Sequence, residues 1–531
     1  MSGYRVPDGD GEVLAVPPWA RVGEMVQANR ALLAQTALAE WREQARVEVL
    51  AAARAYLHAV GQPLPAEAIA QAESAGSLLV SGHQPELSHP GVWAKNFALA
   101  GLARACGAVP LNLVVDNDTI KSVALRLPMW AAGIDPRQVV LHAERFDQWT
   151  GETPYENRAV ADEGLFASLP ERLGPLLAGW PFVPLLPRVW AEMVGLQGRQ
   201  ALLGERIAYA RRQVERSWGC QNWELPVSWL CRTHSFARFA ARLLADAPRL
   251  VQVYNTVVRE YRRRNRIRSR HHPVPDLLVD ADWCEVPFWG QRDGQSQRGR
   301  LQARVRADRV ELRVGAEEWP SLPLHRTAEA LGAMQQAGFA IRTRALTTTL
   351  LARLVVGDCF IHGIGGAQYD ALTDELCRRY FGIAPPGFAV VTATLRLPLP
   401  RYPATTADWL SQQRRQRELY WNPQRALAQS PDPAIQGLVR RRQALVAEQP
   451  PTRRGRRTRF AELASVTAQL RTAVVDLLQA NGRELDRLEA QLHANALLGR
   501  RDFACWLHPE DSLRAFCTRL QRQAAELDRL A

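Results

Sequence analysis

The fold class of this chain is decided by residues 77–118, which read SLLVSGHQPELSHPGVWAKNFALAGLARACGAVPLNLVVDND. A short apolar run, 78–80, leads into a loop rich in Gly, Pro and His. A helix is expected over about 92–106, and a second apolar run covers 111–115. Two strands joined by one helix over this length form a βαβ unit with parallel strands. The stretch therefore predicts an α/β protein.

The loop after the first strand is the first candidate site. Ligands of open α/β sheets bind at the carboxyl ends of strands, and a helix start offers free N–H groups to an anion. Loop histidines can donate to phosphate oxygens. We therefore expect a nucleotide phosphate to be bound here, by Gly82, His83, Gln84, His89 and Lys95. In the alternative interpretation, Pro85 and Pro90 shape a rigid loop whose histidines cap backbone groups.

Polar residues also follow the second strand, as Asp116-Asn117-Asp118-Thr119 and then Lys121. Carboxylates at a strand end can bind a ribose hydroxyl, a magnesium ion carried by a nucleotide, or a substrate ammonium group. We expect Asp116 and Asp118 to be catalytic together with His83. The competing interpretation is an Asx turn that caps a following helix.

A third candidate is the glycine-rich segment His362-Gly363-Ile364-Gly365-Gly366, which follows an apolar strand. Such glycines allow unusual backbone angles or close approach to a ligand. Gly365 and Gly366 are expected to contact the nucleotide, and the alternative is a tight turn into a helix over 366–380. Residues 155–158, Tyr-Glu-Asn-Arg, are a possible lid or substrate wall.

Four units are predicted along the chain. Residues 1–75 are an N-terminal helical segment with a helix over 25–60, and 76–400 form the core with inserted connecting segments, including a β-hairpin near 300–315. Residues 401–500 form an antiparallel coiled-coil hairpin, and 501–531 are a tail that packs back on the core. The hairpin helices are expected at 406–447 and 458–498, joined by the turn EQPPTRRGRRTR.

Composition narrows the function classes. The net charge is +13, but only Lys95 and Lys121 are lysines, so arginine fills ordinary surface positions throughout and nucleic acid is not the expected partner. The Arg-rich segments 262–272 and 453–459 are read mainly as solvated faces. Eight cysteines without metal-ligand spacing predict no structural metal. With neither a membrane-spanning segment nor a secretory signal, a cytoplasmic location is expected.

These motifs, in this order, resemble the cysteine-adding enzymes of bacillithiol biosynthesis. That family has an early strand with a TGQQ-like loop and a second strand ending in acidic residues, matched here by SGHQPELSHPGVWAKNF and LNLVVDND. A strand, a Gly-Gly turn and a Phe-Gly before a further strand correspond to 347–395, and WLHPEDSLRAF matches the family's tail. The resemblance covers about 76–520. His83 replaces a glutamine-type position, and 116–121 lacks the family's acidic-histidine pattern.

The resemblance implies a Rossmann-like nucleotidylyl-transferase-type core with insertions, a bound nucleotide (ATP or ADP), and the joining of cysteine to the amino sugar of glucosaminyl-malate. A homodimer through the coiled coil is also expected. The residues carried over are Gly82, His83, Gln84, Asp116, Asp118, Gly365 and Gly366. The alternative is a non-catalytic module that binds a nucleotide or another anion and uses its coiled coil for dimerisation or partner recruitment.

Overall fold

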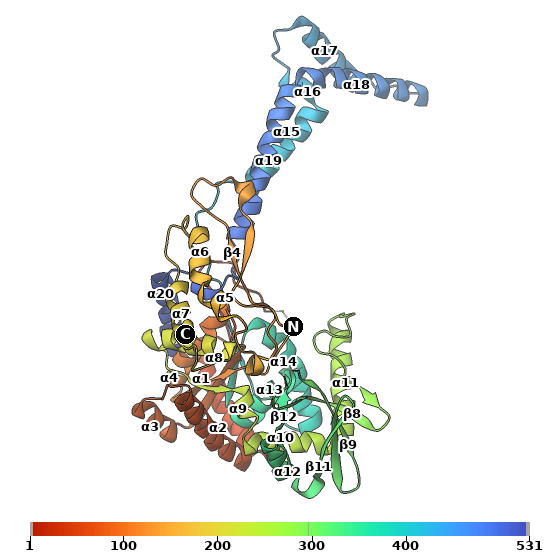
Figure 1. Ribbon diagram of the computed structural model, residues 1–531. Coiled ribbons are helices and arrows are strands. Elements are labelled where there is room, and N and C mark those ends of the chain that lie inside the picture. The colour runs from red at the N-terminus through yellow and green to blue at the C-terminus, as the bar shows by residue number, and fades with distance from the viewer. Residues whose placement is uncertain (1–3, 296, 527–531) are drawn as a thin grey trace.

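A computed structural model describes residues 4–295 and 297–526. Figure 1 shows a body built around β-sheets and a helical arm that projects from it. The chain is a mixed α/β protein, as the sequence predicts, and each of its two largest sheets has six strands. None of the helices in the described part of the chain combines the length and the apolar character needed to cross a membrane.

The first sheet is mainly parallel, with the order β1-β14-β13-β2-β3-β6. Only β1 is antiparallel to its neighbour β14. Numbered along the chain, the five parallel strands lie in the order 3-2-1-4-5, so the order reverses beside β2. The strands are β1 (Val13–Val16), β2 (Ser77–His83), β3 (Ala108–Val114), β6 (Trp223–Pro226), β13 (Cys359–His362) and β14 (Ala389–Ala393).

The predicted βαβ unit is β2, α4 (Pro90–Ala105) and β3, and its two strands pair in parallel as expected. Alternating side chains of β2 enter different cores: Leu78 and Val80 lie in one cluster and Leu79 in the other. Helix α4 is buried along most of its length because the sheet covers one side and α20 (Glu510–Ala525) the other. A Cβ at Gly101 would lie 2.3 Å from Gln521 O, so α20 requires glycine there.

Helices cover both faces of this sheet. The core shared with α4 also receives α1 (Trp19–Ala34), whereas α2 (Ala39–Ala59) contributes to the opposite core. The single helix predicted over 25–60 is wrong, because α1 ends at Ala34, the chain turns at 35–38 and α2 begins at Ala39. The remaining helices of the opposite core are α9 (Val227–Leu230), α10 (His234–Ala245), α11 (Ala247–Arg264), α12 (Thr327–Gln336), α13 (Ala345–Leu351) and α14 (Ile364–Leu376).

The segment between β3 and β6 is an insertion that packs into the same hydrophobic core as α4. It contains β4 (Ala124–Pro128), β5 (Leu141–Arg145), α5 (Glu163–Ala167), α6 (Leu169–Leu177), α7 (Leu186–Val194) and α8 (Leu203–Ser217). Helix α3 (Ala66–Ser74) precedes β2.

The second sheet is antiparallel, with the order β11-β10-β9-β8-β12 and a short β7 (Val279–Asp280) beside β8. Its strands are β8 (Trp283–Arg292), β9 (Gly299–Val305), β10 (Arg309–Val314), β11 (Glu317–Pro323) and β12 (Phe339–Thr343). The hairpin predicted near 300–315 is confirmed as β9 and β10, outside the parallel sheet.

The arm consists of helices that run out from the body and return (Figure 1). Asn481 donates to Gln412 O and Arg471 donates to Tyr420 O, so the outgoing and returning helices are antiparallel. The helix predicted over 406–447 is interrupted because Pro423 and Pro433 start new helices, and the returning chain bends at 474. The helices are α15 (Thr406–Trp421), α16 (Pro423–Ala426), α17 (Pro433–Ala447), α18 (Arg453–Ala473) and α19 (Val475–Leu498).

The turn at the end of the arm is shorter than predicted. Helix α18 begins at Arg453, inside the segment expected to be the turn, because the Thr452 hydroxyl caps it by accepting from Gly455 N (3.1 Å). The turn proper is therefore limited to residues 448–452.

Candidate functional site

Both early strand ends lie at the same edge of the parallel sheet. His83 pairs with Val114, and Val115 N donates to His83 O (2.9 Å). Beyond the strands, Gln84 Nε2 donates to Asp118 Oδ2 (2.9 Å), which ties the two loops together. The structure therefore brings His83, Gln84, Asp116 and Asp118 into one region.

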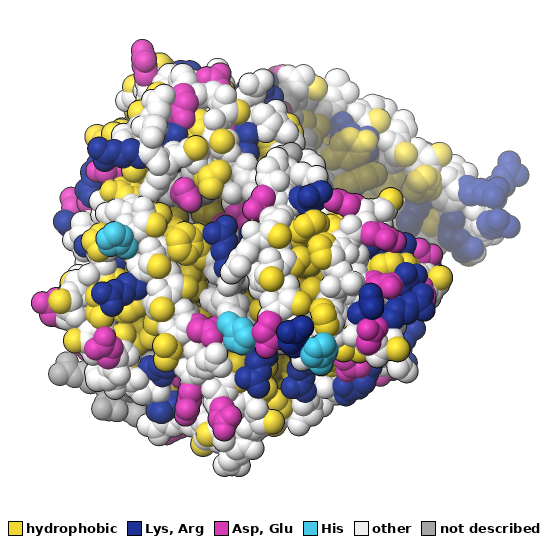
Figure 2. Space-filling model, turned by 60° about the horizontal axis from the view of Figure 1, so that its bottom comes forward, with side chains coloured by type: hydrophobic (Ala, Val, Ile, Leu, Met, Phe, Trp, Pro, Cys, Tyr) yellow, Lys and Arg dark blue, Asp and Glu magenta, His cyan; other side chains and the backbone are white. Residues whose placement is uncertain are grey.

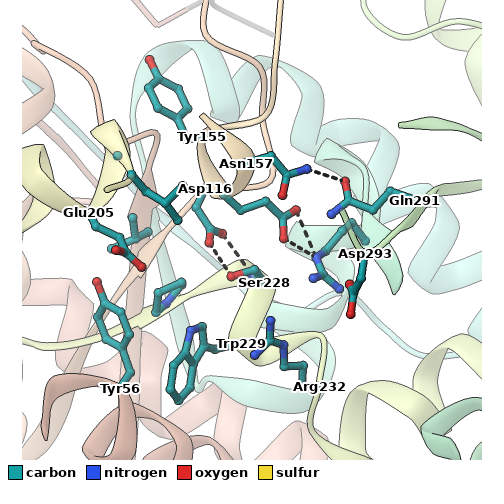
Figure 3. A pocket seen from close by; sticks show the side chains of 16 residues that line it. Tyr56, Asp116, Tyr155, Asn157, Glu205, Ser228, Trp229, Arg232, Gln291 and Asp293 are labelled. Atoms are coloured by element: carbon teal, nitrogen blue, oxygen red, sulfur yellow. Dashed lines mark hydrogen bonds and ion pairs between the residues drawn. The ribbon is translucent and has the colours of Figure 1, made fainter. Parts of the chain in front are cut away.

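A cavity of about 140 Å³ opens at this edge (Figure 3). It is bounded by the ends of β3 and β6, the start of α8, and strands β8 and β12 of the second sheet. Its polar and aromatic lining includes Asp116, Glu156, Glu205, Ser228, Trp229 and Arg342. The cavity thus lies where the parallel sheet meets the two inserted segments.

Asp116 is the carboxylate at the end of β3. It accepts hydrogen bonds from Ser228 N (2.9 Å) and from the Ser228 hydroxyl, both at the start of α9 (Figure 3). Burial, reinforced by the neighbouring Glu156 carboxylate, raises the pKa of Asp116 to about 7. A carboxyl group that changes protonation state near neutral pH and faces a cavity is suited to general acid–base chemistry.

A buried ion pair lies beside Asp116. Arg342 Nε contacts Glu156 Oε2 at 2.8 Å, and both side chains are less than a tenth exposed. Glu156 N also donates to Asp116 O (2.8 Å), which fixes the pair next to the carboxylate. Arg342 comes from β12, so the second sheet supplies the positive charge of this site.

Aromatic rings and a further carboxylate complete the wall of the cavity. Tyr56 of α2 and Trp229 of α9 lie on one side, and Glu205 projects from the first turn of α8 (Figure 3). Burial raises the pKa of Glu205 as well. Arg232 lies over the Trp229 ring, 5.8 Å from its centroid. Carboxylates with aromatic faces form a suitable environment for an ammonium group.

Asp118 holds the loops rather than facing this cavity. Its carboxylate accepts from Gln84 and from Thr119 N (2.9 Å), and Arg298 lies 3.5 Å away. The next element along the chain is a strand, β4, so the alternative for this segment, an Asx turn that caps a following helix, is not found. Among the predicted site residues, Asp116 is the one that lines the cavity of about 140 Å³.

The loop histidines are neutral and satisfied within the loop. The His83 ring lies 3.1 Å from Gln84 O, and burial together with the Lys95 charge lowers its pKa to about 3. His83 and Gln84 line a smaller cavity of about 20 Å³, and Val114 lines both this cavity and the one that contains Asp116. The His89 ring accepts from Gly91 N (3.1 Å) as the N-cap of α4, and burial lowers its pKa to about 4.

The expectation that the start of α4 binds an anion is wrong in this structure. His89 occupies the first free N–H, and a Cβ at Gly91 would lie 2.3 Å from Ala393 O and 3.1 Å from the Arg501 guanidinium. The helix start is therefore closed by its own cap, by the end of β14 and by Arg501. For His89, the structure agrees with the capping alternative.

Lys95 is a buried ammonium at the carboxyl ends of β2 and β13, which are neighbouring parallel strands. Its side chain is bonded to the end of β2, where Nζ donates to Gly82 O (2.8 Å), and it passes 3.9 Å from the Cβ position of Gly363. Burial lowers its pKa to about 8. Within the described residues no carboxylate lies within 4.0 Å of Nζ. Lys121, in contrast, is exposed and pairs with Glu152 at 2.5 Å.

Helix α14 starts next to the Lys95 side chain, at the glycine-rich segment. Its N-cap, Gly363, provides no side chain, and a Cβ at Gly365 would meet no atom within 4 Å. Gly366 has a packing role, since a Cβ there would lie 2.7 Å from His362 Nδ1. Unusual backbone angles were expected here, but the glycines with positive φ in the described chain do not include these three.

Several residues of the cavity carry no sequence signal. Ser228 and Arg342 reach Asp116 and Glu156 from positions 112 and 186 residues away, and Glu205 is an ordinary first-turn acid of a helix. Tyr155, Glu156 and Asn157 line the cavity, consistent with a substrate wall. Among the described residues, no group of three or more His, Cys, Asp or Glu side chains is placed to hold a metal ion.

Comparison with known proteins adds no relative to this geometry. No protein-family model matches the chain, and no curated protein matches it significantly.

Proposed function

We propose that this chain is a ligase-like enzyme that joins a carboxylate, such as that of cysteine, to the amine of an amino sugar, with a nucleotide bound at the carboxyl edge of a Rossmann-like core. The strand order 3-2-1-4-5 supports the core assignment, since doubly wound sheets bind ligands where the order reverses. The resemblance to the cysteine-adding enzymes of bacillithiol biosynthesis supports the reaction class.

The observation that carries the proposal is Asp116. An amine attacks an acyl carbon only as the free base, so the enzyme must remove a proton from the substrate ammonium group. Asp116 faces the cavity with a pKa of about 7, and the Ser228 N–H and hydroxyl hold its orientation. In the carboxylate form it binds the ammonium and then takes its proton.

The region around Lys95, at the end of β2 and the start of α14, fits the phosphate of a nucleotide better than the start of α4 does. Lys95 supplies a buried positive charge without a carboxylate partner, and the start of α14 leaves open space at Gly365. Gly82, Lys95 and Gly365 would therefore hold the group, whereas His89 would not. A bound nucleotide would supply the phosphoryl or adenylyl group that activates the carboxylate for attack.

The test is incubation of the purified protein with ATP, cysteine and glucosaminyl-malate, followed by mass detection of the amide product. Product formed by the natural protein and lost in Asp116→Asn supports the proposal. If both proteins form product at the same rate, Asp116 is not the base. Binding of ATP with no product from this substrate pair contradicts the cysteine-adding reaction.

One observation favours the second candidate, a non-catalytic nucleotide- or anion-binding module that dimerises through its arm. Exposed apolar side chains lie along the arm, among them Leu410, Trp421 and Leu477, which are 40%, 60% and 42% exposed. This module predicts a dimer in light scattering that Trp421→Glu dissociates, together with nucleotide binding in the absence of turnover.

A further inference from the structure

The end of the arm concentrates positive charge. Residues 440–462 contain eight arginines and two glutamates, a net charge of +6 within 23 residues, whereas the whole chain carries +13. Figure 2 shows Lys and Arg side chains gathered at the far end of the projecting arm. Nearly half of the net charge therefore lies at the outer end of the arm.

Four arginines at the start of α18 have no acidic partner among the described residues. Arg453, Arg454, Arg456 and Arg457 are exposed, and within the described chain none of them has a carboxylate oxygen within 4.0 Å. Neighbouring surface arginines do find acids, as Arg441 does with Glu462 at 2.5 Å. The abundance of arginine in this chain accounts for the residue type but not for the absence of partners.

The position of the cluster is unfavourable for the helix that bears it. All four arginines lie in the first turns of α18, where the helix dipole favours acidic residues, and the first turn contains none. Folding alone therefore does not favour this arrangement. A bound polyanion would neutralise these charges and so relieve their mutual repulsion. The release of its counterions would favour binding.

We propose that the end of the arm, residues 440–462, binds the phosphate backbone of double-stranded nucleic acid without reading its sequence. Arg453, Arg456 and Arg457 lie on one face of α18, spaced three and four residues apart, and so can contact successive phosphates. Within residues 440–462 the one aromatic residue is Phe460, which is 73% exposed. Single-strand binders instead interleave several aromatics with basic residues, so a duplex is favoured.

An anionic membrane is the other polyanion with this chemistry. Interfacial helices place an apolar stripe opposite their basic face. The end of the arm exposes only Phe460 and Val446 as large apolar side chains within 440–462. Nucleic acid is therefore the better fit, and membrane binding becomes an outcome of the test.

The experiment measures fluorescence anisotropy of a labelled DNA duplex with the full chain as salt is increased. If about four phosphates are neutralised, affinity falls roughly 100-fold between 50 and 200 mM salt. Replacing Arg453, Arg454, Arg456 and Arg457 together by Gln should reduce the slope of log affinity against log salt by about 3 to 4. Circular dichroism checks that the helices of the variant are intact.

The matched control removes the same charge elsewhere. Arg263, Arg264, Arg266 and Arg268 are exposed arginines at the end of α11 and in the loop that follows it. Their replacement by Gln should leave duplex affinity within about twofold of the natural protein, if binding is local to the arm. Equal loss in both variants, no duplex binding, or tighter binding to phosphatidylserine vesicles than to the duplex would each overturn the proposal.

Discussion

The loop after β2 and the cavity after β3 occupy the same edge of one sheet, but their polar groups are used in opposite ways. In the β2 loop, His89 caps its own helix and His83 lies against Gln84 O, so these groups are satisfied internally. After β3, Asp116 faces a cavity with a raised pKa. A carboxyl group that changes protonation state near neutral pH is a better candidate for chemistry than histidines that stay neutral there.

The comparison also separates two helix starts. Helix α4 begins under the His89 cap and against Ala393 O, whereas α14 begins at Gly363 with no side-chain cap and open space at Gly365. Lys95 lies between them and is bonded to the end of β2. An anion bound at this edge of the sheet would therefore contact Lys95 and the start of α14 rather than the start of α4.

The largest expected effect is that of Asp116→Asn. If Asp116 is the base, turnover falls at least 100-fold, and the rate of the natural protein rises with pH through about 7 as the carboxylate forms. The raised pKa also means that the charged form destabilises the fold above pH 7. Asp116→Asn should therefore gain about 1 kcal/mol of stability at pH 8, measured by urea denaturation.

The pH dependence provides the contradiction. Because the pKa of Asp116 is higher in the folded state, its stabilising effect is present at low pH and is lost as pH rises through about 7. Lowering the pH from 8 to 4 should therefore reduce the stability advantage of Asp116→Asn over the natural protein. An equal difference at both pH values would assign the change to packing and not to ionisation.

Arg342→Met tests the ion pair that lies beside this carboxylate. It leaves Glu156 buried without its partner, which should cost about 3 kcal/mol of stability. The Arg342 charge lowers the pKa of Asp116 while Glu156 raises it, so losing the arginine moves the pH–rate midpoint upward. In the double variant Glu156→Met/Arg342→Met, most of the stability should return; a double variant as unstable as the single one contradicts the charge explanation.

The sequence was sufficient for local features and insufficient for distant ones. The βαβ unit could be predicted because apolar runs of strand and helix length follow one another within 77–118. Asp116 could be found because it directly follows a buried strand. Ser228 and Arg342 could not, because they join the site from 112 and 186 residues away, and only the second sheet's position brings Arg342 there.

The two histidines illustrate the reverse error. Histidine near glycine and a helix start is typical both of phosphate loops and of helix caps, and only atomic positions separate the two. The arm shows a similar limit: apolar spacing predicts helices over 406–498, but Pro423 and Pro433 begin new helices where a continuous one was expected.

Lys95→Met tests whether Lys95 binds a nucleotide phosphate. The chain offers a close control, because Lys121 is its only other lysine. Nucleotide affinity should fall roughly tenfold or more, measured by calorimetry, if Lys95 meets a phosphate. Burial lowers the pKa of Lys95 to about 8, so at pH 7 the side chain is charged and its burial destabilises the fold. Removing the ammonium group in Lys95→Met should therefore stabilise the protein at pH 7 by about 1 kcal/mol. Lys121→Met, at an exposed site, should change neither quantity; unchanged affinity in Lys95→Met removes Lys95 from the site.

The smallest effect is expected at His89, where the structure predicts a structural role. His89→Ala removes the cap of α4 and should cost about 1 kcal/mol of stability, while nucleotide affinity stays the same. His89→Asn supplies another capping side chain and should restore most of that stability.

The pKa of His89 is lowered to about 4, so its contribution to stability is lost as pH falls from about 6.5 to 4, when the unfolded chain takes up the proton first. His89→Asn should lose less stability than the natural protein over that interval, because asparagine does not titrate. A fall in nucleotide affinity in both variants would instead return the start of α4 to the binding site and reverse the contrast between the two halves of the sheet edge.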